Sequence, residues 1–266
     1  MGIYSFCDIA LMFFIYSFIG WMLEVVFFTV TTGGFVNRGF LNGPVCPIYG
    51  VGALLVIMCL LPLKEHFLLL YICSVIITSA LEFITGMVLE KVYHVRWWDY
   101  SDHPFNLKGH ICLGFSLMWG VACVVLMYVI HPPISAMTLK LGDTLKTVIV
   151  CVFGAAFVSD IAVTVATLKK LRLRLRTMHR IADKMHELSD GVGRHVFEAA
   201  ESAVKRYDKI TESDEFKELK EKYNKLIEEN GALQKRIIKA FPTMRSKNHS
   251  AVLKAVREKI ERHKKK

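Results

Sequence analysis

Two glutamates lie inside long apolar runs of this sequence, where a carboxylate can bind a solute or carry a proton. Glu24 belongs to the run of residues 5–31, and Glu82 belongs to the run of residues 67–89. A charged side chain is unfavourable in hydrocarbon, so such a residue normally faces protein or water and often marks a functional site. The structural alternative is a hydrogen bond or an ion pair, for instance with Arg38, and the sequence leaves both interpretations open.

Two irregular loops follow these runs and supply further polar and aromatic side chains. The loop of residues 33–50 holds five glycines and two prolines, which permit sharp turns and close backbone contacts. The loop of residues 94–112 holds three histidines and two adjacent tryptophans. The candidate substrate-binding residues are the two glutamates and these loop residues: Arg38, Asn42, Arg96, Trp98, Asp99, Asn106 and His110.

The side chains of the second loop could also serve in ways other than solute binding. Its aromatic residues could form a belt at the membrane interface, where Trp and Tyr are enriched. Arg96 and Asp99 lie three residues apart and can simply pair with one another. A chemical alternative is that a glutamate, Asp99 and His110 act as acid and base in an enzyme that modifies a lipid at the cytoplasmic face.

The elements that must position these residues are membrane-spanning helices. Hydrophobic residues make up 53% of the 266 residues. Five apolar runs are long enough, at about 1.5 Å per residue, to cross roughly 30 Å of hydrocarbon. The second is marginal and begins with glycine and proline, so a re-entrant segment is an alternative there. The expected fold class is an all-α polytopic bundle of about five transmembrane helices, at residues 5–31, 46–63, 67–89, 112–130 and 145–168.

The charges divide the chain into two predicted domains. Residues 1–168 hold seven Lys and Arg against nine Asp and Glu, whereas residues 169–266 hold 27 against 15. The first part is the predicted transmembrane domain, and the second is a basic helical tail. Since Lys and Arg gather on the cytoplasmic side, the cluster that begins at Lys169 predicts a cytoplasmic tail and an N-terminus outside. We therefore expect a multi-pass protein of the plasma membrane.

A short pattern occurs twice and suggests a duplicated helical hairpin. Leu-Glu ending at Glu24 precedes Gly-Pro-Val-Cys ending at Cys46, and Leu-Glu ending at Glu82 precedes Gly-His-Ile-Cys ending at Cys112. Parallel repeats of this kind occur in transporters, where an axis along the membrane normal relates the halves. We expect the two hairpins to superpose with Glu24 over Glu82.

The tail carries amphipathic patterns of its own. An a/d heptad stripe, typical of a coiled coil, runs through Phe216, Leu219, Tyr223, Leu226, Asn230, Leu233, Ile237 and Ala240. Gly191 and Gly193 are expected to interrupt the preceding helix. The tail helices could pack as a hairpin or form a homo-oligomer. The basic cluster is expected to lie against the anionic surface of the lipid bilayer and not to bind nucleic acid.

Several motifs of known chemistry are absent from the sequence. It has no Gly-x-x-x-x-Gly-Lys-Ser/Thr phosphate loop, no Gly-x-Ser-x-Gly and no His-Glu-x-x-His, so no ATPase or hydrolase activity through these motifs is expected. The seven cysteines form no Cys-x-x-Cys pair and, together with the histidines, match no zinc signature. We therefore expect neither a metal site nor a cofactor.

The loop sequences together resemble a known bacterial membrane family. The resemblance is carried by Asn-Arg-Gly-Phe-Leu-Asn-Gly-Pro-x-Cys-Pro-Ile-Tyr-Gly at residues 37–50, Leu-Glu at 81–82, Trp-Trp-Asp-Tyr-Ser at 97–101 and Asn-Leu-x-Gly-x-Ile-Cys at 106–112. Over about residues 1–165, the chain is similar to the family described as putative ABC-transporter type IV permease. The resemblance implies a permease of the bacterial plasma membrane, for which a separate ATPase subunit is one conceivable partner.

Three functions fit these observations. The first is a permease-like subunit that binds or moves a small solute, with Glu24 and Glu82 at its centre and the loops as an inner gate. The second is a membrane enzyme that acts on a lipid or lipid-linked substrate. The third is a sensor or scaffold that acts through its helical tail. The resemblance favours the first, and the sequence specifies neither the substrate nor the direction of transport.

Overall fold

The computed structural model describes residues 4–196, 214–228, 231–246 and 249–262, and this part of the chain is mainly helical. Strands β2 and β3 pair antiparallel, with Asn106 opposite Cys112. The elements in chain order are α1 (Phe6–Thr32), α2 (Pro47–Leu60), the 3₁₀ turn η1 (Leu61–Leu63), α3 (Phe67–Tyr93), β1 (Val95–Arg96), β2 (Asn106–Leu107), β3 (Ile111–Cys112), α4 (Leu113–Val125), the π-helical turn η2 (Leu126–Ile130), α5 (His131–Lys140), α6 (Asp143–Val196), α8 (Asp214–Glu228), α9 (Ala232–Ala240), β4 (Arg245–Ser246) and α10 (Ser250–Arg262).

Four helical stretches among the described residues are apolar and long enough to cross a membrane. They are Phe6–Thr31, Phe67–Tyr93, Leu113–Lys140 and Asp143–Glu187. The second apolar run of the sequence forms a shorter helix, Pro47–Leu63, which is made of α2 and η1. The chain is therefore an all-α, multi-pass membrane protein, as the apolar runs predict, while its orientation in the membrane stays a prediction.

Local sequence explains where the helices begin, end and change form. Ser5 caps α1: its hydroxyl accepts from the Asp8 backbone N–H, and the Asp8 carboxylate accepts from the Ser5 backbone N–H. The helix ends at Gly33, whose φ of 73° is a left-handed conformation that glycine adopts without strain. A π-helical turn precedes His131 and two prolines, because proline has no N–H to continue the α-helical hydrogen bonds.

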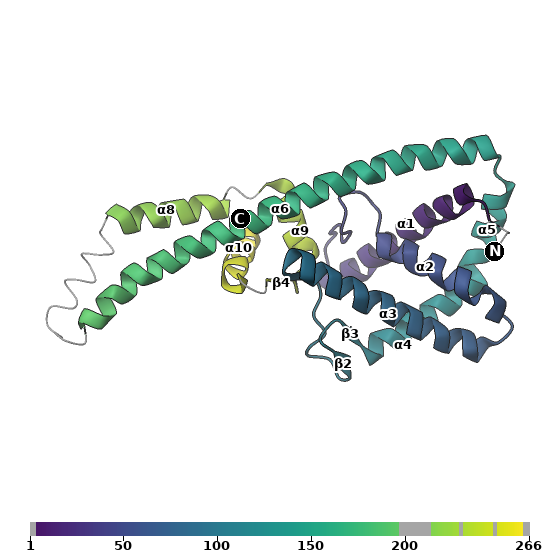
Figure 1. The fold of residues 1–266 in the computed structure, drawn as a ribbon, viewed down its shortest axis with the longest axis horizontal. Helices are drawn as coiled ribbons and strands as arrows, with labels where there is room; N and C mark the ends of the chain where they lie inside the picture. The colour runs from purple at the N-terminus through teal and green to yellow at the C-terminus, as the bar shows by residue number, and fades with distance from the viewer. Residues whose placement is uncertain (1–3, 197–213, 229–230, 247–248, 263–266) are drawn as a thin grey trace. The chain divides into compact units, whose positions relative to one another are not determined.

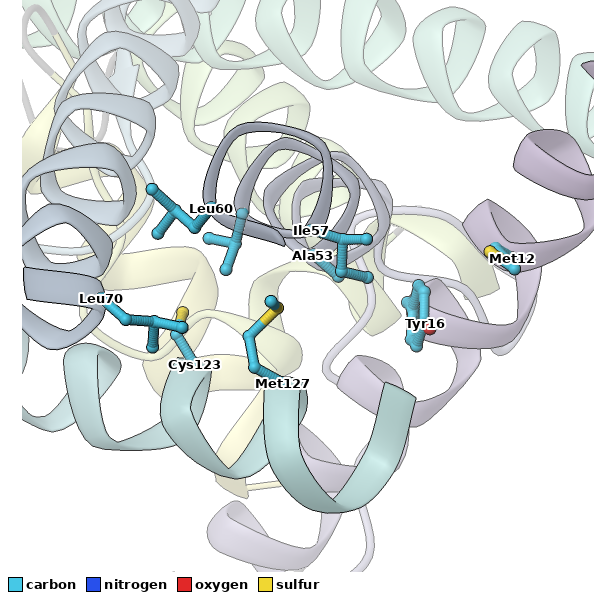
Figure 2. Packing of buried hydrophobic residues seen from close by; sticks show 9 residues of the cluster. Met12, Tyr16, Ala53, Ile57, Leu60, Leu70, Cys123 and Met127 are labelled. Atoms are coloured by element: carbon cyan, nitrogen blue, oxygen red, sulfur yellow. The ribbon is translucent and has the colours of Figure 1, made fainter. Parts of the chain in front are cut away.

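Helices α1 to α4 form two hairpins that pack on each other through α2 and α3 (Figure 1). Within the hairpins, α1 packs on α2 and α3 packs on α4. Buried apolar side chains from all four helices and η2 meet in one core (Figure 2): Met12, Tyr16, Ala53, Val56, Ile57, Leu60, Leu70, Cys123 and Met127. Because close-packed cores resist changes of volume, this cluster fixes how the hairpins sit against one another.

Two glycines let α1 and α2 approach closely. A methyl carbon at Gly20 would lie 2.2 Å from Cγ of Tyr49, and one at Gly50 would lie 2.1 Å from Oγ of Ser17. A side chain at either position would have to displace its neighbour, which is why small residues are common where membrane helices pack. The close approach places the Tyr49 ring beside α1.

The chain divides into two compact units. The first comprises Met1–Ala166 together with Arg236–Arg245, and the second comprises Thr167–Lys235 together with Ser246–Lys266. The charge division of the sequence predicts a separate tail from residue 169 onward. The placement of Arg236–Arg245 in the first unit is a finding that this division does not anticipate.

The end of α6 differs from the sequence-based expectation. The helix continues through Gly191 and Gly193 to Val196, so the predicted interruption at these glycines is wrong. A glycine weakens a helix by about 1 kcal/mol and does not by itself end one. The basic cluster that begins at Lys169 and the last apolar run both lie on α6.

The heptad stripe does not run along one continuous helix. Helix α8 ends at Glu228 and α9 begins at Ala232, while Asn230 lies outside the described residues. Within the second unit, Nη1 of Arg174 donates to Oε1 of Gln234 at 2.8 Å, which ties α6 to the start of α9. A coiled coil and a homo-oligomer formed through the tail stay predictions.

The Gly20→Ala variant tests the close contact of α1 and α2. We expect it to lower the free energy of unfolding by about 1–3 kcal/mol, because the added methyl group overlaps the Tyr49 ring. Reversible unfolding in mixed detergent micelles measures this change. Gly154→Ala in α6 is the matched control, because a methyl carbon there meets nothing within 4 Å. Equal stability of the two variants would contradict the packing described.

Candidate functional site

Glu24 is held by two partners, one from the first loop and one from α2. Its Oε2 lies 3.3 Å from Nε of Arg38, and the Tyr49 hydroxyl donates to Oε1 at 2.5 Å. The Arg38 guanidinium also lies 4.8 Å from the centroid of the Phe28 ring, in a cation–π contact. The ion pair is half-buried, and both oxygens of the carboxylate have a partner.

Glu82 has one partner and one open oxygen. The Tyr100 hydroxyl donates to Oε1 at 3.2 Å. The Tyr100 ring stacks on Phe115 of α4, with ring centroids 4.9 Å apart, and this packing directs the hydroxyl towards the glutamate. Oε2 of Glu82 is buried and has no hydrogen-bond partner among the residues that the structure describes. Such an oxygen gains free energy when a donor reaches it.

The two glutamates belong to one polar group between the hairpins, which we call the acidic site (Glu24, Tyr49, Glu82 and Tyr100). The carboxylates are close enough for their charges to interact, and each tyrosine interacts electrostatically with Glu24. The Tyr49 ring packs edge-on against Trp119 of α4, with centroids 5.4 Å apart. Each hairpin thus supplies one glutamate and one tyrosine. The superposition expected for a duplicated hairpin stays a prediction.

A second polar network lies at the start of the second loop. Nε of Arg96 lies 3.1 Å from Oε2 of Glu90, and its Nη1 lies 3.3 Å from Oδ1 of Asp99. Nε2 of His110 lies 3.3 Å from the same Glu90 oxygen. Arg96 therefore joins the end of α3 to the loop, and Glu90 lies beside side chains from both ends of the loop.

Asp99 is an ionised anchor of this loop. Its Oδ1 accepts from the backbone N–H and the hydroxyl of Ser101, at 3.1 and 2.5 Å. Burial opposes ionisation, but the hydrogen bonds from Ser101 and the charges of Arg96 and Arg245 lower the pKa of Asp99 below its usual range. A general acid or base works best with a pKa near the working pH, so these contacts favour a structural role.

His110 is a buried histidine at the end of the second loop. Burial lowers its pKa below the ordinary value, despite the opposing charges of Glu90 and Asp99. The Trp98 indole N–H donates to the backbone carbonyl of His110 at 2.8 Å. Trp98 thus holds the loop where the His110 ring lies beside Glu90 of α3.

Asn106 closes a turn within the second loop. Its amide donates to the carbonyl oxygens of Ser101 and His103, at 3.2 and 2.8 Å, and its Oδ1 accepts from the Gly109 N–H at 3.1 Å. Gly109 has a φ of 70°, which favours glycine because a Cβ would be strained there. The polar atoms of Asn106 are therefore used by the loop itself.

Asn42 fastens the first loop to α6. Its backbone N–H and its side-chain amide donate to Oδ1 of Asp160 at 3.0 and 2.8 Å, and the Gly43 N–H donates to Oδ2 at 2.7 Å. Thr164, one turn further along α6, also donates to Oδ1 of Asp160 at 3.2 Å. Asp160 is thus the acceptor that holds the turn of the first loop.

The structure brings only part of the predicted set together. Glu24, Glu82 and Arg38 meet between the hairpins, and their role in binding stays a prediction. The other candidates form contacts that shape the loops: Asn42, Arg96, Trp98, Asp99, Asn106 and His110. Sequence reasoning missed Tyr49 and Tyr100 as partners of the glutamates. Both lie in segments that carry the family resemblance, and this is the one signal that could have singled them out.

A further polar cluster, which no motif indicated, holds the first turns of α1. His131 is 5% exposed, and its ring nitrogens Nε2 and Nδ1 lie 3.2 and 2.8 Å from the hydroxyls of Tyr4 and Tyr16. Nζ of Lys146 lies 2.8 Å from Oδ1 of Asp8. A neutral imidazole has one donor and one acceptor nitrogen, so one tyrosine donates to the ring and the other accepts from it. These contacts tie α1 to α5 and α6.

Metal-ligating side chains are not grouped into a site in the described part of the chain. No group of three or more His, Cys, Asp or Glu side chains that could hold a metal ion is found there. The seven cysteines are free, and Cys46 and Cys112 are buried at the starts of α2 and α4.

The chain matches one family profile. The profile of the family described as Putative ABC-transporter type IV matches residues 11–165. This range contains the acidic site, both loops and Asp160, and it ends before Arg236–Arg245. No curated protein and no solved structure matches the chain.

The Asp160→Ala variant tests the attachment of the first loop. We expect a loss of about 2 kcal/mol or more in the free energy of unfolding, because two backbone N–H groups lose their acceptor. Unfolding in mixed micelles measures the loss, and hydrogen exchange at residues 42–43 should speed up with it. Ser159→Ala is the control, since that exposed hydroxyl donates only to a carbonyl of its own helix. The anchor would be disproved if the two variants were equally stable.

Proposed function

We propose that this chain, which belongs to the family described as Putative ABC-transporter type IV, is a permease-like subunit that binds and moves a small solute at the acidic site. Multi-pass architecture and family membership support the transporter class. The hydrogen-bond partners of the two glutamates support the acidic site as the place where the solute binds. The proposal gives the intramembrane carboxylates a function that structural pairing alone does not require.

The observation that carries the proposal is the open oxygen of Glu82. Its neighbour Glu24 has partners on both oxygens, whereas Oε2 of Glu82 is buried without one in the part of the chain that the structure describes. A carboxylate that served only to hold helices together would be expected to use both of its oxygens. An unused acceptor inside a helix bundle is instead a place for the donor group of a solute.

The chemistry of the acidic site favours a small cation. Arg38 pairs with Glu24, whereas no cationic side chain pairs with Glu82 in the part of the chain that the structure describes. The tyrosine hydroxyls that reach the two glutamates belong to rings that pack on Phe115 and Trp119. An ionised carboxylate in such a site attracts a cation by its charge.

The two loops would control access to the site from one side of the membrane. Arg38 of the first loop contacts Glu24 directly, and Tyr100 of the second loop contacts Glu82. With the tail in the cytoplasm of a bacterial cell, as the basic cluster indicates, this is the inner side of the plasma membrane. The sequence contains no phosphate-binding loop, so ATP would be hydrolysed by a separate subunit if the transport is driven by ATP.

The Glu82→Gln variant tests the proposed site. The full chain is reconstituted in proteoliposomes, and uptake of Na⁺, K⁺, tetramethylammonium and putrescine is measured separately. For a cation that the unmodified protein transports, we expect uptake to fall at least tenfold in the variant, because glutamine keeps the size of the side chain and removes its charge.

Glu65→Gln is the matched control, because Glu65 is an exposed carboxylate outside the acidic site. Thermal unfolding of each purified variant shows whether the fold is retained. Unchanged uptake in a folded Glu24→Gln, Glu82→Gln double variant would refute the proposed site. A panel in which the unmodified protein moves no cation would refute the proposed solute class.

A further inference from the structure

A short segment near the C-terminal end of the chain, Arg236–Arg245, belongs to the same compact unit as the membrane helices. We call it the clasp segment. It comprises the last turns of α9 and the turn that follows, where the Phe241 N–H bonds to the Ile237 carbonyl and the Met244 N–H bonds to the Phe241 carbonyl. Its contacts are made with the two loops that border the acidic site.

The first end of the clasp segment holds the first loop. Nη1 of Arg236 donates to the carbonyl oxygen of Gly39 at 2.9 Å, and Nη2 donates to that of Phe40 at 3.3 Å. A guanidinium that spans two adjacent carbonyls fixes their direction, because its donors lie in one rigid plane. This stretch of loop also contains Arg38, the partner of Glu24.

The middle of the clasp segment packs between the loops. The Phe241 ring lies edge-on to Trp97 of the second loop, with centroids 4.8 Å apart, and Trp97 is only 3% exposed. Phe40 of the first loop packs on the same indole, with centroids 5.1 Å apart. The guanidinium of Arg38 lies 5.9 Å from the centroid of the Phe241 ring. Trp97 therefore contacts an aromatic ring of the clasp segment and one of the first loop.

The far end of the clasp segment holds the second loop by charge. Nη1 of Arg245 lies 3.1 Å from Oδ2 of Asp99, whose other oxygen is used by Arg96 and Ser101. The Arg245 side chain is 66% exposed, so this ion pair is the most accessible of the contacts. One ten-residue segment thus contacts both loops through an arginine at each end and an aromatic ring between them.

We propose that the clasp segment is a reversible lock, which ties the two loops together and thereby closes the loop side of the acidic site. Three of its side chains make the contacts described above, Arg236, Phe241 and Arg245, and the last of them is largely exposed. Such contacts can be broken by a competitor that offers a better partner to either the loops or the clasp segment. That the clasp segment binds the two loops does not depend on the proposed function. That it closes the acidic site does rest on the proposed function.

Hydrogen exchange of the full chain in nanodiscs tests the lock. In an Arg236→Ala, Phe241→Ala, Arg245→Ala triple variant, we expect amides of residues 33–46 and 94–112 to exchange at least tenfold faster. The control is Lys235→Ala, Lys239→Ala, which removes two exposed positive charges from the same helix. This control should leave exchange in both loops unchanged, because both lysine side chains are exposed.

A second variant covers the case in which the triple variant fails to fold. Arg245→Glu places a carboxylate beside Asp99 at an exposed position, and it should speed up exchange in the second loop at least threefold. Unchanged exchange in both loops of a folded triple variant, or in the second loop of Arg245→Glu, would overturn the proposed lock.

Uptake measured on the same samples separates the lock from the transport proposal. Where the unmodified protein transports a cation, release of the lock should raise its initial rate at least threefold. Faster loop exchange with an unchanged uptake rate would overturn closure of the site by the clasp segment. If no cation is transported, the proposed function fails, and loop exchange still decides whether the clasp segment binds the loops.

Discussion

Keeping carboxylates inside an apolar helix bundle is the constraint on which the rest of this structure depends. A buried carboxylate is tolerated only when donors reach it, and here the donors are tyrosine hydroxyls. Tyr49 donates to Glu24 and Tyr100 donates to Glu82, so each glutamate has a donor from its own hairpin. Arg38 pairs with the other oxygen of Glu24, whereas Oε2 of Glu82 has no partner among the described residues. This difference between the two glutamates is the observation on which the proposed solute site rests.

The surrounding architecture serves to deliver these donors. Gly20 leaves room for the Tyr49 ring beside α1, and stacking on Phe115 positions Tyr100. The loops that carry the other partners are held in turn by carboxylates, since Asp160 accepts from the first loop and Asp99 from the second. Acidic side chains therefore act here in two ways. Glu24 and Glu82 form the acidic site, whereas Asp99 and Asp160 hold the two loops.

The sequence predicts the apolar membrane-spanning helices well, because these depend on local composition. Apolar runs specify helices whatever their partners, and the family resemblance rests on contiguous motifs. The partners of a side chain depend instead on how distant segments meet. Nothing near Asn42 in the sequence indicates that Asp160 lies against it, and the heptad stripe gives no sign that Arg236 reaches the first loop. Likewise, α6 continues through Gly191 because the surrounding helix outweighs the low helix propensity of a single glycine.

An experimental map of the full chain in a lipid nanodisc, by electron cryomicroscopy at side-chain resolution, tests the central claim most directly. The account predicts that the carboxylates of Glu24 and Glu82 lie together between the hairpins. Each should be within hydrogen-bonding distance of its tyrosine, Tyr49 or Tyr100, with density for a solute or water at Oε2 of Glu82. Carboxylates that point apart into headgroups or bulk water, with neither tyrosine in reach, would contradict the account.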